Sequence, residues 1–242
     1  YLVHMNVSGE VDQLTYGRRK GVKAIGETCP QYLFFSEDDL RKDDGAKYVC
    51  SPPLRKVEDQ NRLWQALEDG EIQVLATDHC PFYYDGSQPI SYEGQKIAIS
   101  GKELGTQKGH DNFTLIPNGL PGLADRLPVF WTAAVNSGRI SPMQFVALCA
   151  TNPAKIFGLY PQKGTLEVGS DADIAIWDPK KQVSYGKAIA KQRTDYNLYE
   201  GMQLIGFPIR VLLRGKTIVE GEQWYGEAGA GKFLKRKPGT FI

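Results

Sequence analysis

The sequence lacks several features that mark common protein classes. None of its apolar runs approaches the roughly 20 residues needed to cross a bilayer, so no membrane association is expected. It also lacks a strong charge of either sign: 29 Lys and Arg residues against 28 Asp and Glu residues leave a formal charge of +1. Without a basic field for phosphate backbones, a nucleic-acid partner is not expected either. The 242 residues, 41% of them hydrophobic, fit a soluble globular protein that binds a small molecule.

The sequence has few cysteines. The four cysteines, Cys29, Cys50, Cys80 and Cys149, lie far apart, form no C-x-x-C pair, and sit within or beside apolar segments. This pattern predicts buried free thiols in a reducing cytoplasm. The alternative, a zinc knuckle, normally needs close pairs of ligands that these spacings do not provide.

The first part of the chain alternates apolar runs with amphipathic segments. Residues 1–5 form a strand-like run, a helix is expected over 10–20, and a short apolar run follows at 22–26. Apolar residues at spacings of 3, 4 and 7 predict a second helix over 57–67. The continuous apolar stretch 72–76 then predicts a buried strand. Alternation of this kind is typical of parallel βαβ units.

The middle of the chain breaks this pattern. Residues 81–121 are mostly polar and much longer than an ordinary connection, with a possible small hairpin around Glu93-Gly94. Helices are expected again over 123–136 and after Ser141-Pro142, where serine can cap the helix and proline can take its first position. A third, shorter helix is expected after Thr151-Asn152-Pro153.

Beyond Tyr160 the character changes to short β runs separated by turns, which predicts a separate antiparallel module. We place the boundary near Pro161, with Arg214-Gly215-Lys216 as a tight connection between two strands and residues 226–237 as a solvated tail. The expected strands are 164–168, 172–177, 209–213 and 217–219.

Two residues that can carry chemistry fall at predicted strand ends. His4 ends the first apolar run, and Asp78 follows the strand over 72–76. In β/α barrels the reactive groups lie at the carboxyl ends of strands, where an imidazole and a carboxylate can together bind a divalent metal. Taken singly, His4 also fits a core histidine and Asp78 a helix N-cap, and spacing alone does not decide between these readings. His79, next in the chain, fits packing or support of a neighbour better than metal ligation.

Five motifs follow one another along essentially the whole chain. They are Gly26-Glu27-Thr28-Cys29-Pro30-Gln31-Tyr32-Leu33, Cys50-Ser51-Pro52-Pro53-Leu54-Arg55, Thr77-Asp78-His79-Cys80, Ile116-Pro117-Asn118-Gly119 and Gly169-Ser170-Asp171-Ala172-Asp173-Ile174. In order and spacing they resemble those of hydantoinases and dihydropyrimidinases, which are cyclic amidohydrolases. Along this chain the resemblance is interrupted by an enlarged loop between Phe82 and Gly109.

The resemblance implies roles for four residues. His4 corresponds to a metal-binding histidine, and Asp78 to the aspartate that ligates a metal and moves the proton in catalysis. Ser51 and Asn118 correspond to positions whose main-chain groups hold the substrate. Two divalent metal ions, zinc in the first instance, and a homo-oligomer, a tetramer in the family, are implied as well. The family's His-x-His pair, carboxylated lysine, further histidine ligand and substrate-binding tyrosine have no counterpart in this sequence.

The resemblance also implies the fold class, α/β. Residues 1–160 would be the C-terminal half of a metal-dependent (β/α)8 barrel, and 161–242 a small β-sandwich module with its tail. Independently, only about four βα units can be counted where a closed barrel needs eight. We therefore expect the chain to be the C-terminal portion of a longer protein, or one of two fragments that associate, and to be inactive alone.

The implied reaction is hydrolysis of a hydantoin or dihydropyrimidine ring to an N-carbamoyl amino acid. Two alternatives stay open at this point. The first is an amidohydrolase of the allantoinase or dihydroorotase type, which shares the metal chemistry but acts on another ring. The second is a non-catalytic relative that keeps the fold for assembly, as the collapsin response mediator proteins do; retention of His4 and Asp78 argues against it.

Overall fold

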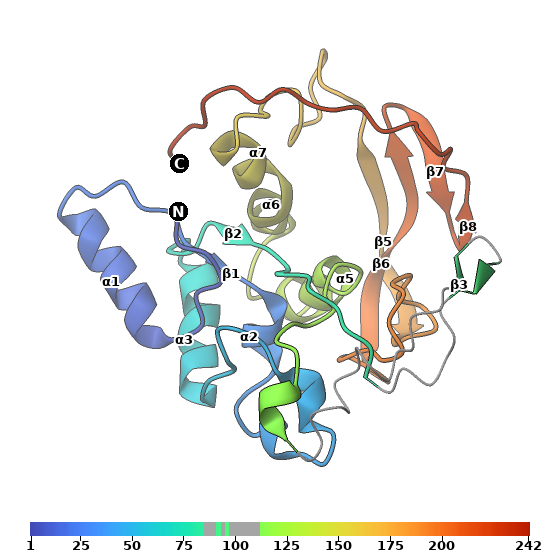
Figure 1. The fold of residues 1–242 in the computed structure, drawn as a ribbon. Coiled ribbons are helices and arrows are strands. Elements are labelled where there is room, and N and C mark those ends of the chain that lie inside the picture. Colours follow the sequence, from blue (N-terminus) through green and yellow to red (C-terminus); the bar gives the residue numbers. More distant parts are fainter. Residues whose placement is uncertain (85–90, 93–94, 97–111) are drawn as a thin grey trace.

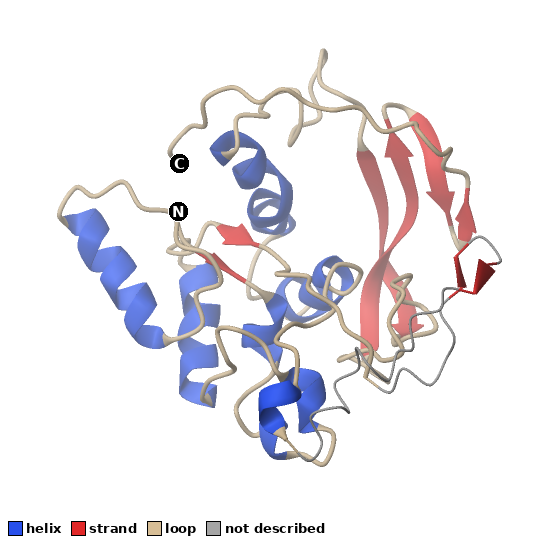
Figure 2. Cartoon of the chain, viewed as in Figure 1, coloured by secondary structure: helices blue, strands red, loops and turns tan. Residues whose placement is uncertain are grey.

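The computed structural model describes residues 1–84, 91–92, 95–96 and 112–242. Helices and short parallel segments from the first part of the chain gather on one side of the molecule, and an antiparallel sheet from the last part stands on the other (Figures 1 and 2). Both chain ends lie on the helical side, because the C-terminal tail crosses back over the top of the view (Figure 1).

Four short parallel segments follow one another in chain order. Leu2 bridges Gly26, strand β1 (Glu27–Thr28) pairs with β2 (Val74–Leu75), and His79 bridges Leu120, all in parallel. Parallel neighbours require a crossover between them. Helices supply the first two crossovers, and the third, between His79 and Leu120, lies largely outside the described residues. The βαβ units expected from the sequence are therefore present, as an open row of segments. Leu2 lies at the outer edge of this row and is 45% exposed.

Two twelve-residue helices cover this row, and both begin with a carboxylate that accepts free amides. In α1 (Ser8–Arg19) the Glu10 carboxylate accepts the Asn6 amide at 2.7 Å. In α3 (Val57–Glu68) the Asp59 carboxylate accepts the Lys56 amide at 3.3 Å and also the Ser8 amide at 2.8 Å, which ties the two helices together. Both helices were predicted, each within two residues of its observed ends.

A short buried helix was missed by the sequence pattern. Helix α2 (Pro30–Phe34) begins with proline in its first turn, and four of its five residues are buried. Because it is buried on nearly all sides, it shows no amphipathic periodicity. The 3₁₀ turns η1 (Asp39–Arg41) and η2 (Gly45–Tyr48) follow it and lead to Cys50.

Two longer helices each contain a π-helical turn. The first joins α5 (Arg126–Phe130) to η5 (Trp131–Val135), and the second joins α6 (Pro142–Val146), η6 (Ala147–Thr151) and α7 (Asn152–Ile156) without a break. The Ser141 cap was predicted correctly: its Oγ accepts the Gln144 amide at 3.2 Å. The short helix expected after Thr151-Asn152-Pro153 is present as α7, but it continues from η6 rather than standing apart. The wider turn of η6 accommodates Pro153, which has no amide to donate and would clash with a regular helix.

The antiparallel sheet has the order β5 (Ile174–Ser184), β6 (Gln203–Leu213), β7 (Lys216–Glu220) and β8 (Gln223–Trp224). Arg214 and Gly215, with φ of 47° and 80°, form the two-residue turn between β6 and β7 that the sequence indicated. Strands β5 and β6 are much longer than predicted. In the described residues this part of the chain forms one sheet, so the second layer of a sandwich is not seen.

The sheet packs on α5 and η5 through a glycine. Gly206 of β6 has φ of 92°, and a Cβ there would lie 2.2 Å from the indole nitrogen of Trp131. The bare backbone lets the Trp131 ring approach the strand, where it contacts Trp177 at 5.2 Å between ring centres. The Thr132 hydroxyl donates to the Ile205 carbonyl and accepts the Ile205 amide on the same strand.

A single buried carboxylate connects the helical side to the segment between β5 and β6. Asp125 is fully buried and accepts hydrogen bonds from Tyr185 Oη at 2.7 Å, Asn197 Nδ2 at 2.8 Å and Gln192 Nε2 at 2.9 Å. Tyr199, from the same segment, packs against Phe34 and Phe35 of the α2 region. Residues 185–199 carry no regular structure, so these side chains hold them in place.

Three predictions for loops can be compared with the structure. Residues 164–168 form no strand; they turn, because Gly164 and Gly169 have φ of 82° and 100° and Thr151 Oγ1 donates to the Gly164 carbonyl. The small hairpin is present as strands β3 (Ser91–Tyr92) and β4 (Gln95–Lys96), paired antiparallel. Its turn at 93–94 and the remainder of the long loop over 85–111, His110 included, lie outside the described residues.

The C-terminal tail is not simply solvated, as the sequence suggested. The Lys237 amide donates to the Gly158 carbonyl, and the Thr240 amide donates to the Lys155 carbonyl, both at 2.9 Å. Gly158 and Gly239 permit this approach, because a Cβ on either would lie 1.8 Å from a carbonyl oxygen of the other segment. Among the described residues, no helix is both long and apolar enough to span a membrane.

Asp125→Ala should lower the free energy of unfolding by about 3 kcal/mol, because it leaves three buried donors without an acceptor. Urea unfolding followed by circular dichroism measures the change. Asp43→Ala, at an exposed carboxylate, is the control and should stay within about 0.5 kcal/mol of wild type. A loss below about 1 kcal/mol for Asp125→Ala would contradict the anchoring role.

Gly158→Ala should release the tail, because the new methyl group would occupy the position of the Lys237 carbonyl. Trypsin cleavage after Lys235 and Arg236 should become at least several-fold faster, as read by intact mass. Gly229→Ala is the matched control: its φ of 80° imposes the same backbone strain, but a Cβ there meets nothing within 4 Å. Equal cleavage rates in the two variants would show that the tail is not held at Gly158.

Candidate functional site

His4 and Asp78 lie at the same edge of the parallel row. The Leu2 carbonyl accepts the Glu27 amide at 2.9 Å, and the Ala76 amide donates to Thr28 at 2.9 Å, so β1 stands between the segments that carry the two residues. Since all three segments run in one direction, their carboxyl ends meet at one edge. His4 is half-buried there, and Asp78 is exposed.

Both residues have an unusual backbone conformation. His4 has φ of 41° and Asp78 has φ of 47°; Arg214, in the β6–β7 turn, is the third non-glycine residue with positive φ in the described ranges. The left-handed region costs an L-residue roughly 1–2 kcal/mol. Strain of this kind persists only where neighbouring contacts impose it, and it concentrates at functional sites. The strained backbone of His4 and Asp78 therefore supports a functional role for the edge of the parallel row at which they lie.

The loop segments that carry Ser51 and Asn118 are tied to each other and to the Asp78 strand end. The Gly119 amide donates to the Val49 carbonyl at 3.0 Å, and the Cys80 amide donates to Leu120 at 3.0 Å. A Cβ on Gly119 would lie 2.3 Å from the Cys80 carbonyl, so the two chains are in direct contact. Ser51 and Asn118 are both exposed. The structure thus gathers the Ser51, Asn118 and Asp78 segments, with His4 beyond β1.

His79 makes a contact that the sequence did not reveal. Its Nδ1 accepts the main-chain amides of Gly122 and Leu123, each at 3.1 Å. The neutral ring therefore carries its proton on Nε2. Burial lowers the pKa of His79 from its usual value, which favours this neutral form. These bonds agree with the supporting role predicted for His79.

Glu27 lies between the two strand ends that carry His4 and Asp78. Its carboxylate accepts the His4 main-chain amide at 3.4 Å and the Tyr1 hydroxyl. Burial, and then Glu27, raise the pKa of Tyr1 well above its ordinary value. Glu27 thus helps to hold His4 in its strained conformation.

Two buried thiols, Cys29 and Cys50, lie near enough to Asp78 to feel its charge. Burial is the main cause that raises the pKa of Cys50 to about 12, and the charge of Asp78 adds to it. The pKa of Cys29 is also raised, by burial first and then by the charges of Glu27 and Asp78. Both thiols therefore stay protonated at neutral pH and do not offer thiolate ligands. The expectation of four buried thiols holds for Cys29 and Cys50, whereas Cys149 is half-buried and Cys80 is exposed.

The donor set at this edge suits a divalent metal only in part. Imidazole and carboxylate are ligands that zinc takes, but a structural or catalytic zinc site needs three or four of them. In the part of the chain that the structure describes, no three His, Cys, Asp or Glu side chains are grouped closely enough to hold a metal ion. His4 and Asp78 thus fit part of a metal site, and its other ligands are not among these residues.

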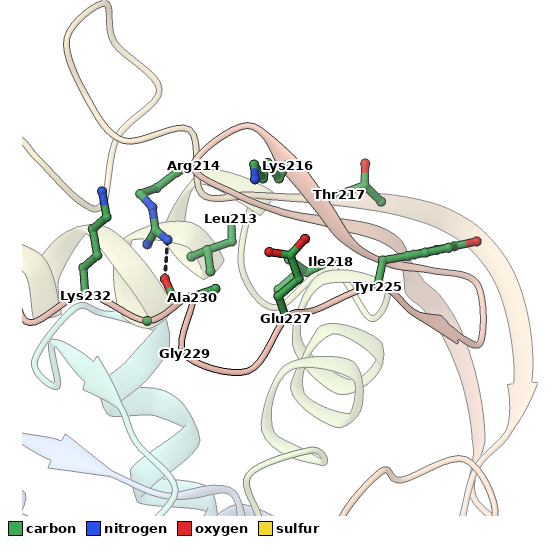
Figure 3. A pocket seen from close by; sticks show the side chains of 11 residues that line it. Leu213, Arg214, Lys216, Thr217, Ile218, Tyr225, Glu227, Gly229, Ala230 and Lys232 are labelled. Carbon is green, nitrogen blue, oxygen red and sulfur yellow. Dashed lines mark hydrogen bonds between the residues drawn. The ribbon is translucent and has the colours of Figure 1, made fainter.

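A cavity with charged lining residues lies elsewhere. A cavity of about 510 Å³ opens between the β6–β7 turn and residues 225–232 (Figure 3). Arg214 lines it, but its guanidinium is already engaged with the Ala230 carbonyl at 2.6 Å. None of the four predicted site residues lines this cavity, and its positive and negative side chains are mixed, so it carries no functional assignment.

The strand ends, the tied loops and the motif order can be compared with known proteins. A profile of the amidohydrolase family matches residues 23–218. The chain belongs to the amidohydrolase family. It is 41% identical over 239 residues to a D-hydantoinase of Rhizobium radiobacter and 40% identical over 238 residues to one of Geobacillus stearothermophilus, covering 98% of this chain in both cases.

Solved structures give the same result for this amidohydrolase. Dihydropyrimidinase from Brevibacillus agri matches 99% of the chain with a TM-score of 0.88 and 42% identity, covering 49% of that chain. L-hydantoinase from Arthrobacter aurescens matches 97% with a TM-score of 0.82 and 31% identity, covering 48% of that chain. The resemblance found in the sequence is thereby confirmed. The chain spans about half the length of the curated relatives it matches.

Alkylation of the native amidohydrolase chain should discriminate among its cysteines. At pH 8 iodoacetamide should label exposed Cys80 first, while Cys29 and Cys50 react only after unfolding. A pKa of about 12 leaves the Cys50 thiolate at a fraction on the order of 10⁻⁴, and burial blocks access as well. Peptide mass spectrometry over time measures the order. Labelling of Cys29 or Cys50 as fast as Cys80 would contradict the packing described here.

Proposed function

We propose that this chain forms the Asp78 side of the active site of a hydantoinase-type cyclic amidohydrolase. The reaction is the opening of a hydantoin or dihydropyrimidine ring to an N-carbamoyl amino acid. The observation that carries the proposal is the meeting of His4, Asp78 and the Ser51 and Asn118 segments at one edge of a parallel row, with strained backbone at both proposed ligands.

In this proposal His4 and Asp78 bind two divalent metal ions together with ligands that lie outside the described residues. We propose zinc, because imidazole and carboxylate groups are ligands that zinc takes. When bound, such ions polarise a carbonyl and make a water molecule more acidic. The proposal includes the complete architecture: a (β/α)8 barrel to which residues 1–160 contribute, a β-sandwich module over 161–242, and a homo-oligomer.

The residues of this chain would then act as follows. A carboxylate oxygen of Asp78 takes the proton from the attacking water as the water oxygen bonds to the ring carbonyl carbon. The same oxygen returns that proton to the ring nitrogen when the carbon–nitrogen bond breaks, so that this nitrogen becomes the neutral NH2 of the carbamoyl group, which stays attached to the opened product. The exposed main-chain groups at Ser51 and Asn118 orient the ring amide at this edge.

The family's other activities are distinguishable from this proposal. An allantoinase or dihydroorotase would use the same edge on differently substituted rings, and a non-catalytic assembly protein would open none. Relatives in both comparisons are named hydantoinases or dihydropyrimidinases, which supports the hydantoin and dihydropyrimidine rings as substrates.

Asp78→Asn should lower kcat by about 10²–10⁴-fold in the assembled enzyme, which contains this chain and the remaining metal ligands, because it removes the proton acceptor. Ring opening of hydantoin and dihydrouracil, with metal content by mass spectrometry, measures the effect. Asp43→Asn should leave the rate unchanged, and the purified 242-residue chain should be inactive. Activity of Asp78→Asn within about tenfold of wild type at unchanged metal content would remove Asp78 from this role.

A further inference from the structure

Asp78 is held by main-chain contacts on both sides. Before it, the Ala76 amide bonds to the Thr28 carbonyl of β1 at 2.9 Å. After it, the Cys80 amide bonds to the Leu120 carbonyl at 3.0 Å, and the His79 side chain bonds to Gly122 and Leu123. Asp78 itself, with φ of 47°, is the strained link between these two anchored stretches. Loss of one anchor would let its backbone relax toward an ordinary conformation.

Through its side chain, His79 attaches this strand end to the turn before α5. The Arg126 amide bonds to the Gly122 carbonyl at 3.0 Å, so the hydrogen-bond ladder of the helical turn begins at Gly122. The Gly122 and Leu123 amides precede that ladder and have no partner within it. The Nδ1 lone pair of His79 accepts both, so one ring atom fixes two amides.

We propose that His79 is a positioning residue: through Nδ1 it fastens the turn at Gly122 and Leu123 to the strand end and thereby keeps Asp78 in its strained, productive orientation. This inference rests on the proposed function, since it concerns the proton transfer assigned to Asp78. His79 does not touch the substrate in this account. The Asn118 segment has its own bond, from the Gly119 amide to Val49, so it stays in place when His79 is replaced.

Asparagine and glutamine at position 79 both offer a carbonyl oxygen as acceptor, but they place it at different distances from Cα. In asparagine the Oδ1 atom lies the same number of bonds from Cα as His79 Nδ1 and can accept the same amides. In glutamine the carbonyl oxygen is one bond further out, where Nε2 would be, and cannot reach them without rearrangement. His79→Asn should therefore preserve the anchor, and His79→Gln and His79→Ala should remove it.

The first measurement needs no activity. Residue-resolved amide hydrogen exchange of the 242-residue chain should show Gly122 and Leu123 protected in wild type and in His79→Asn. In His79→Gln and His79→Ala these two amides should exchange at least tenfold faster, while the Cys80 amide changes little. Wild-type protection of both amides in His79→Gln would overturn the proposal, because the anchor would not depend on Nδ1.

The second measurement uses ring-opening kinetics of the assembled enzyme on hydantoin. His79→Gln should lower kcat at least tenfold with KM within threefold of wild type, and His79→Asn should restore most of kcat. Fast exchange in His79→Gln with an unchanged kcat would overturn the positioning role, as would an equal loss in His79→Asn. A wild-type assembled enzyme that opens no ring would overturn the proposed function instead, and the exchange result alone would then decide whether His79 is the anchor.

Discussion

The buried carboxylate of Asp125 is the constraint on which the two sides of the molecule depend. It lies at the start of α5 with no cation bonded to it among the described residues, and three neutral donors from residues 185–199 satisfy it. A charge without water is stable only when its hydrogen bonds are complete. The irregular segment can therefore take only a conformation that brings all three donors to one point, and that conformation places Tyr199 against the α2 region. Because this segment joins β5 to β6, its conformation also sets the orientation of the sheet.

The same turn that contains Asp125 also reaches the proposed active-site edge. Gly122 and Leu123, a few residues earlier, contact His79, while Arg126 donates to the Leu75 carbonyl of β2 at 2.8 Å. Residues 119–126 are thus bonded to the strand that precedes Asp78, to the residue that follows it, and to the segment between β5 and β6. The strained conformation at Asp78 is supported by this packed surrounding rather than by its own loop.

Much of the fold could be predicted from the sequence because its signals are local. The periodicity of α3, the Ser141 cap and the Arg214-Gly215 turn each depend on a few neighbouring residues. The strand over 164–168 was predicted wrongly, because its alternating pattern resembles a strand while the flanking glycines turn the chain. Helix α2 was missed because burial on nearly all sides removes the periodic signal.

In the candidate site, too, features set by local sequence could be predicted, whereas contacts between distant segments could not. The placement of His4 and Asp78 at one edge follows from their position after apolar runs, which a sequence displays directly. The hydrogen bonds of His79 cannot be read in that way, because its partners arrive from more than forty residues along the chain and are main-chain amides that no residue type reveals. The same holds for the close approach of Gly119 to Cys80, which depends on the tertiary arrangement alone.

The attachment of the C-terminal tail to α7 makes the antiparallel sheet part of a closed loop. Strands β5 to β8 all lie between Gly158 and Lys237, whose main chains are bonded to each other. The entropy cost of closing a loop grows only with the logarithm of its length. A contact across so many residues therefore has only a modest free-energy cost once the sheet has formed. The sheet lies inside this loop, so the ends of the sheet-forming part of the chain are held next to α7. Loss of the sheet would leave the tail contact to close a long flexible loop, whereas the tail can detach while the sheet stays folded.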